Sequence, residues 1–133
     1  MIVDASVAAR WFLDEPGAEG AQALLHSGEP LFAPDLILVE VAGALRAAVF
    51  SGAIDRQDAF MACRRLGEAF EALTPSTRLA PRALELALDL KLGVSACCYL
   101  ALAEERGEVL VSADRVLIHA LRQGPFAATI RLL

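Results

Sequence analysis

Two aspartates occupy positions where a carboxylate can do chemistry. Asp4 follows the apolar run Ile2-Val3, and Asp114 follows Val109-Leu110-Val111 after two small residues. In a parallel α/β sheet, ligands bind outside the carboxyl ends of the strands, so an acid that directly follows a strand lies at that edge. Each aspartate could instead only cap the helix behind it. Both interpretations stay open for either residue taken singly.

Glu40 is a third acid in an unusual position. It lies in Leu36–Phe50, which is apolar except at Glu40 and Arg46. This pattern predicts a buried helix, in which an unpaired carboxylate is costly. Arg46 lies roughly 240° further round the helix axis, too far to pair with Glu40. Glu40 therefore needs a partner outside its helix, either an arginine such as Arg10 or a site shared with the two aspartates.

Carboxylates brought together repel each other, and they stay ionised at neutral pH only beside a cation. Oxygen ligands alone favour Mg²⁺ or Mn²⁺, and zinc is not expected because His26 and His119 are predicted in loops or at the surface. A carboxylate-held Mg²⁺ mostly serves phosphate chemistry. The sequence contains no GxxxxGK[ST] or GxGxxG loop, so it gives no support for a P-loop ATPase, a nucleotide-driven kinase or a dinucleotide oxidoreductase. A phosphodiesterase remains, and an acid-lined phosphatase stays possible.

The composition bounds the kind of protein. The 133 residues, 56% of them hydrophobic and 22% charged, predict one folded domain over residues 1–133. The net charge of −5 argues against binding nucleic acid by bulk electrostatics, but it does not exclude a nuclease with a local basic rim. We expect a cytoplasmic protein without a membrane span, because no leader or long apolar stretch is present. The three cysteines, Cys63, Cys97 and Cys98, are expected to be buried thiols.

Short apolar strands alternate with helices along the chain. Strands are predicted at 1–3, 31–33, 72–74, 109–111 and 129–132. Helices are predicted at 5–13, 18–25, 36–50, 55–70, 81–91 and 95–106, and a last helix begins at residue 114. Residues 75–79 are predicted to form a loop. Each helix returns the chain to start the next strand in the same direction, so the sheet should be mostly parallel. The predicted fold is an α/β sandwich.

These segments resemble the PIN-domain ribonucleases, and within them the VapC-like toxins of toxin–antitoxin pairs. Residues 1–6 (Met-Ile-Val-Asp-Ala-Ser) are similar to the opening strand and first acid of the family, and residues 33–42 resemble the segment that carries its second acid, Glu40. Residues 99–104 (Tyr-Leu-Ala-Leu-Ala-Glu) and 111–115 (Val-Ser-Ala-Asp-Arg) look like its final helix, strand and acid. The match runs the length of the chain and implies a PIN-like α/β/α sandwich.

The resemblance also marks a missing residue. The third acid of the family opens the helix that contains the Tyr-Leu-Ala-Leu-Ala run, three residues before the tyrosine, and that position is Ala96 in this chain. Ala96 is either a natural variation or a deliberate change that makes a harmful nuclease producible. Loss of one carboxylate should weaken Mg²⁺ binding and water activation, so little or no cleavage is expected. The fold should be spared, because alanine is tolerated in the first turn of a helix.

The resemblance therefore implies a Mg²⁺-dependent or Mn²⁺-dependent endoribonuclease, a homodimer, and a small VapB-like antitoxin that places an arginine among the acids. Asp4, Glu40 and Asp114 are the expected catalytic metal ligands, and Ala96 marks the fourth position. Supporting polar residues are expected at Ser6 and Ser112, and RNA-binding arginines at Arg10 and Arg46. The alternatives are a degenerate PIN domain that binds RNA or protein without cutting, and a housekeeping PIN nuclease without an antitoxin.

Overall fold

The computed structural model describes residues 1–133 and has a five-stranded sheet at its centre. The strand order is β3-β2-β1-β4-β5, and every neighbouring pair is parallel. In this register Ile2 of β1 lies opposite both Phe32 of β2 and Leu110 of β4. The strands are β1 (Ile2–Val3), β2 (Phe32–Pro34), β3 (Ala72–Thr74), β4 (Leu110–Ser112) and β5 (Ile130–Leu132). The predicted α/β fold with a parallel sheet is confirmed.

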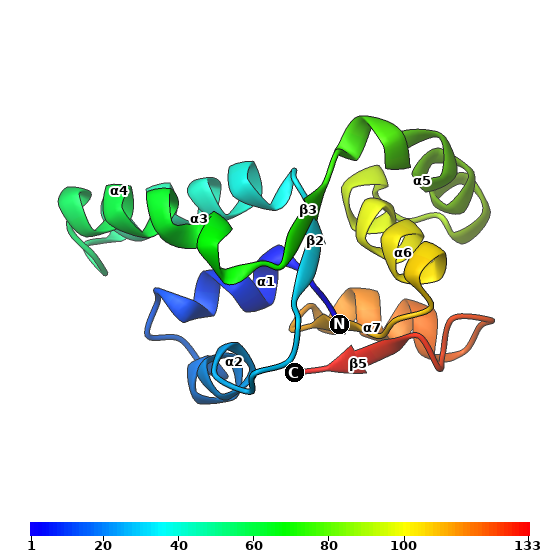
Figure 1. Ribbon diagram of the computed structural model, residues 1–133, viewed down its shortest axis with the longest axis horizontal. Coiled ribbons are helices and arrows are strands. Elements are labelled where there is room, and N and C mark those ends of the chain that lie inside the picture. Colours follow the sequence, from blue (N-terminus) through cyan, green and yellow to red (C-terminus); the bar gives the residue numbers. More distant parts are fainter.

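Helices cover both faces of this sheet (Figure 1). The helices that precede β3 in the chain are α1 (Ala5–Ala8), the short 3₁₀ helix η1 (Ala9–Trp11), α2 (Ala18–Leu25), α3 (Ile37–Ser51), α4 (Arg56–Arg65) and the 3₁₀ helix η2 (Leu66–Ala69). Those that follow β3 are α5 (Ser76–Leu90), α6 (Val94–Arg106) and α7 (Arg115–Arg122). Right-handed crossovers place the two groups on opposite faces, because the chain reverses its direction across the sheet after β3.

That reversal creates a crevice at one edge of the sheet. The chain leaves β1 toward β2 but leaves β4 toward β5, although β1 and β4 are neighbours. The helices that follow these two strands therefore lie on opposite faces of the sheet (Figure 1). In open α/β sheets this reversal is where ligands bind. Asp4 and Asp114 follow the two strands that flank it.

Side-chain capping defines where the helices begin near this edge. Asp4 is the N-cap of α1, and Asp114 is the N-cap of α7; each carboxylate accepts hydrogen bonds from two backbone amides of the first turn. At the other end of the chain's long helices, Gly52 and Gly107 end α3 and α6 in the left-handed conformation, with φ of 79° and 64°. The helix boundaries thus follow signals that are visible in the sequence.

The helix α3 corrects one prediction. It is not buried all round, because Val39 is 77% exposed and Phe50 75% exposed, while Ile37, Val41 and Leu45 face the core. The reason is that α3 forms a hairpin with α4 that extends away from the sheet (Figure 1). The uniformly apolar sequence therefore reflects one core face and one uncovered apolar face.

Three smaller predictions also need correction. The helix α5 begins at Ser76 instead of Pro81, since its buried face against α6 outweighs the hydrogen bond that Pro81 cannot donate. The first and fourth predicted helices end in the 3₁₀ segments η1 and η2. Cys63 is exposed because it lines an open groove between α3 and α4, whereas Cys97 and Cys98 are buried as expected. No single helix is long and apolar enough to cross a membrane, and only the bent pair α5 and α6 passes that test jointly.

Candidate functional site

Asp4 is the centre of a hydrogen-bond network at the carboxyl ends of β1 and β4. Its Oδ1 atom accepts hydrogen bonds from the backbone amides of Ser6 (3.0 Å) and Val7 (3.2 Å) and from the Ser6 hydroxyl (2.5 Å). The Ser6 hydroxyl oxygen in turn accepts the amide of Ala113 at 2.9 Å. One serine thus ties the first acid to the loop after β4.

The Asp4 carboxylate is nearly inaccessible to water, with 6% of the residue exposed. This burial raises the pKa of Asp4 above its ordinary value, although the hydroxyls of Ser112 and Ser6 and the two amides favour the charged form. Ser112 is itself fully buried, and its Oγ accepts the amide of Asp114 at 3.0 Å. Ser6 and Ser112 therefore hold the two loops in register around Asp4.

Glu40 projects from the first turns of α3 toward α6. Its Oε2 atom accepts a hydrogen bond of 2.5 Å from the hydroxyl of Tyr99, a residue that is 2% exposed. Partial burial raises the pKa of Glu40, the Tyr99 hydrogen bond lowers it, and the charge of Asp4 raises it further. Burial and the neighbouring carboxylate also raise the pKa of Tyr99, so this phenol is a donor. Two acids from separate elements thus share one electrostatic environment.

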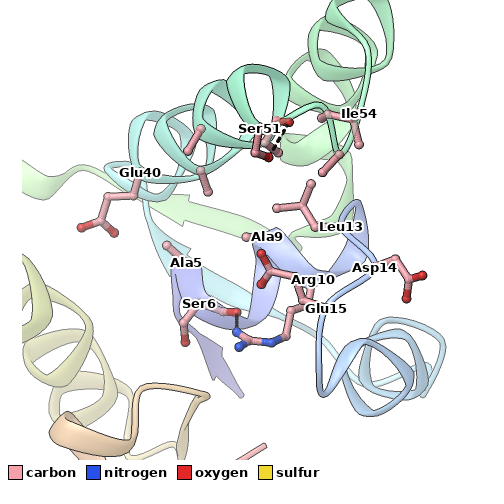
Figure 2. Close-up of a pocket in the computed structure, with 14 residues that line it drawn as sticks. Ala5, Ser6, Ala9, Arg10, Leu13, Asp14, Glu15, Glu40, Ser51 and Ile54 are labelled. Carbon is pink, nitrogen blue, oxygen red and sulfur yellow. Dashed lines mark hydrogen bonds between the residues drawn. The ribbon is translucent and has the colours of Figure 1, made fainter.

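A cleft of about 770 Å³ extends from Glu40 between α1 and α3, and neither Asp4 nor Tyr99 lines it. Figure 2 shows Ser6 and Arg10 on one wall and Glu40 on the other, with Glu40 at the end of the cleft nearest the sheet edge. Arg10 does not pair with Glu40. Its guanidinium donates to the carbonyls of Ser6 and Pro16, the latter at 2.9 Å. The partner of Glu40 is therefore Tyr99 and not an arginine.

Comparison with known proteins agrees with this geometry. The family model for the PIN domain matches residues 1–122. The chain belongs to the PIN-domain family. It is also 32% identical over 119 residues to Ribonuclease VapC3 of Pyrobaculum aerophilum. The aligned residues cover 88% of this chain and 91% of the relative. The resemblance to VapC-like PIN ribonucleases is thereby confirmed.

Position 96 lies near Tyr99 on the helix α6 of this PIN domain. Ala96 lies in the first turn of α6, three residues before Tyr99, and residues at that spacing share a helix face. Because Tyr99 on this face contacts Glu40, a carboxylate at position 96 would project toward Glu40 and Asp4. Ala96 is half-buried against the core and offers no polar atom there.

The oxygen donors of Asp4 and Glu40 fit Mg²⁺ or Mn²⁺, which proteins bind through one or two carboxylates with water and phosphate completing the shell. Asp114 lies at the same sheet edge but is exposed, and its Oδ1 atom accepts the amides of Val116 (2.8 Å) and Leu117 (3.1 Å). No three His, Cys, Asp or Glu side chains are close enough to hold a metal together. The structure therefore does not bring the three predicted ligands, Asp4, Glu40 and Asp114, together as one metal-binding cluster.

The two interpretations of Asp114 can be separated by substitution. Asp114→Asn keeps a capping oxygen, whereas Asp114→Ala removes it, so only the alanine variant should lose about 1 kcal/mol of unfolding free energy. Urea denaturation of both variants measures this difference. In a chain with the acid restored at position 96, both variants should lose RNA cleavage if Asp114 is a metal ligand. Equal cleavage by Asp114→Asn and its parent would leave Asp114 with the capping role alone.

The structure separates the two arginines predicted for RNA binding. Arg10 lies beside Ser6 at the acid site. Arg46 lines an apolar groove between α3 and α4, where its guanidinium carbon lies 4.7 Å from the centre of the Phe50 ring. A role of Arg46 at the acids therefore has no support in this geometry. Analysis of the sequence did not single out the Tyr99 hydroxyl as the partner of Glu40. The signal was present, because Tyr99 belongs to the motif that locates position 96.

Proposed function

We propose that this PIN domain is a metal-dependent endoribonuclease of the VapC type whose activity is impaired at position 96. The observation that carries the proposal is the convergence of Asp4 and Glu40 at the crevice between β1 and β4, with the buried Asp4 carboxylate held by Ser6. The similarity to Ribonuclease VapC3 supports RNA as the substrate. The charge of Asp4 raises the pKa of the half-buried Glu40, and a cation between the two carboxylates would relieve this repulsion.

Each residue has a defined task in this proposal. Asp4 and Glu40 bind the cation, and the Tyr99 hydroxyl fixes the rotamer of Glu40. Ser6 links Asp4 to Ala113, which keeps the two sides of the crevice at a constant separation. A divalent ion bound there would orient a water for in-line attack and stabilise charge on the phosphodiester. Ala96 leaves the ion short of a ligand.

Two partners belong to the same proposal. A VapB-like antitoxin would neutralise the acids with an arginine, since a guanidinium satisfies a carboxylate cluster for the reason that a metal does. A second copy of the chain would cover part of the apolar surface. Exposed large apolar residues support this proposal: Val39, Phe50, Phe60, Met61, Leu84, Leu88 and Val116 are all more than half exposed. Sedimentation of the purified chain tests the dimer.

Restoring the acid tests the enzyme directly. We expect Ala96→Asp to cleave a structured RNA in Mg²⁺ or Mn²⁺ at least about a hundredfold faster than the unchanged chain, because it adds a metal ligand on the face of Tyr99. Gel analysis of labelled RNA, with EDTA as the control, measures the rate. Ala96→Asn is the matched variant, since it adds a polar side chain of the same size without the charge. If neither chain cuts RNA in either metal, the proposal is wrong.

A further inference from the structure

A second cleft, of about 230 Å³, lies at the same sheet edge beyond β4 and β5. Arg10 and Arg115 both line it, together with Gly17 and Ala113, and none of its seven lining residues has an acidic side chain. In a chain with a net charge of −5, a cleft with two arginines and no acid is a local reversal of sign. We call it the arginine cleft.

Neither arginine of this cleft is neutralised inside the protein. No carboxylate lies within ion-pairing distance of Arg10 or Arg115, although other arginines of the chain, such as Arg78, Arg82 and Arg106, have such partners. The Arg10 guanidinium is held in place by two neutral carbonyls, those of Ser6 and Pro16, which fix its position without cancelling its charge. A positioned, unneutralised guanidinium is suited to binding an oxyanion.

The start of α2 lies beside the arginine cleft. Gly17 is the N-cap of α2 in the left-handed conformation (φ 92°), and it provides no side chain to cap that helix. Glu19 in the first turn of α2 partly offsets the positive end of the helix dipole, so the two arginines provide the positive charge of the cleft. A Cβ atom at position 17 would lie 3.5 Å from Arg10 Nε, an ordinary van der Waals distance, so the left-handed backbone and not a lack of space favours glycine here.

The arginine cleft adjoins the acid site. Arg10 donates to the carbonyl of Ser6, whose hydroxyl binds Asp4, and Ala113 of the cleft wall donates to that same hydroxyl. Arg115 directly follows Asp114. We infer that the arginine cleft binds a backbone phosphate of the RNA, next to the phosphodiester that lies over Asp4 and Glu40. This inference rests on the proposed function and names the residues that hold its substrate in register.

The test measures RNA binding without cleavage. Fluorescence anisotropy of a fluorescein-labelled RNA stem-loop, in EDTA and with the unchanged chain, reports affinity alone. Arg115→Ala should weaken binding by about fivefold to twentyfold and lower the slope of log affinity against log salt by about 0.7 to 0.9. The matched control is Arg122→Ala, which removes an exposed, unpaired arginine at the far end of the same helix and should change affinity by less than about twofold.

Arg10 provides a second variant. Arg10→Lys keeps the charge and should retain most of the affinity, whereas Arg10→Gln should lose about as much as Arg115→Ala. Thermal unfolding checks that both variants are folded. Equal, small effects of Arg115→Ala and Arg122→Ala on RNA affinity would contradict the inference that the arginine cleft binds an RNA phosphate. Competition by poly-L-glutamate as strong as that by RNA of equal charge would also overturn it, because the cleft would then prefer carboxylates of a protein partner.

Failure of this inference is distinguishable from failure of the proposed function. Metal-dependent cleavage by Ala96→Asp, together with unaltered RNA binding by Arg115→Ala, would leave the nuclease intact and remove the arginine cleft alone. Absence of both RNA binding by the unchanged chain and cleavage by Ala96→Asp would overturn both.

Discussion

Adding Asp4→Asn to the Ala96→Asp chain is expected to lower RNA cleavage by about a thousandfold or more while leaving the protein at least as stable. Asparagine keeps an oxygen that can accept the amides of Ser6 and Val7, so α1 keeps its N-cap. It removes the negative charge of a buried residue, since only 6% of the surface of Asp4 is exposed. Single-turnover cleavage and thermal unfolding of the two chains measure these effects.

The pH dependence of stability gives this prediction a second readout. In metal-free buffer the raised pKa of Asp4 means that the folded chain holds a proton more readily than the unfolded chain does. The free energy of unfolding should therefore fall as pH rises from the ordinary value of 3.8 through the raised pKa. Asp4→Asn lacks this loss and also relieves Glu40 of a neighbouring charge. Its stability advantage over the parent should grow across that window and then level off.

A marked loss of stability in Asp4→Asn at neutral pH would contradict this account. It would mean that the hydrogen bonds from the Ser6 and Ser112 hydroxyls to the charged carboxylate outweigh the cost of burial. The control is Asp55→Asn, which changes the N-cap of α4 at an exposed position away from the acids. Asp55→Asn should change the cleavage rate and the pH dependence of the unfolding free energy much less than Asp4→Asn does.

Tyr99 should contribute to stability in two separable parts. Tyr99→Phe removes the hydroxyl that binds Glu40 and should cost about 1 to 3 kcal/mol, the usual range for a hydrogen bond to a charged group. Tyr99→Ala also empties the space of a ring that is 2% exposed and should cost about 3 to 5 kcal/mol. Urea denaturation measures both. In the Ala96→Asp background, Tyr99→Phe should also slow cleavage, because Glu40 loses its fixed rotamer.

A double-mutant cycle tests whether the hydrogen bond itself is responsible. Tyr99→Phe and Glu40→Ala remove the two partners in turn, and we expect a coupling energy of about 0.5 to 3 kcal/mol between them. Additive effects would show that the Tyr99 hydroxyl contributes nothing through Glu40. The control is Val41→Ala, which truncates a fully buried apolar side chain of the same helix and should show no coupling with Tyr99→Phe.

Much of the fold could be predicted from the sequence because its signals are local. Asp55 and Asp114 mark helix starts, Gly52 and Gly107 mark helix ends, and β4 is a short apolar run between polar residues. The errors arose where tertiary packing decides. Whether the apolar α3 is covered on all sides depends on how far the hairpin with α4 extends from the sheet, and no local pattern contains that information.

The candidate site shows the same division. The position of Asp4 after a strand follows from sequence order, and so does its nearness to the loop after β4 once the sheet is parallel. The hydrogen-bond partner of Glu40 could not be predicted, because an isolated acid on an apolar helix shows that a donor is required but not which residue provides it. Tyr99 is 59 residues away in the chain, and only the packing of α6 against the sheet brings it to Glu40.

The central claim is that Asp4 and Glu40 hold a divalent metal that lacks a ligand at position 96, and Mn²⁺ binding tests it most directly. Electron paramagnetic resonance counts free Mn²⁺ as the ion is titrated into the unchanged chain, Ala96→Asp, and Ala96→Asp with Asp4→Asn. We predict one site that is at least about tenfold tighter in Ala96→Asp than in the unchanged chain, and that Asp4→Asn abolishes. Equal affinity in all three chains would contradict the assignment of these carboxylates.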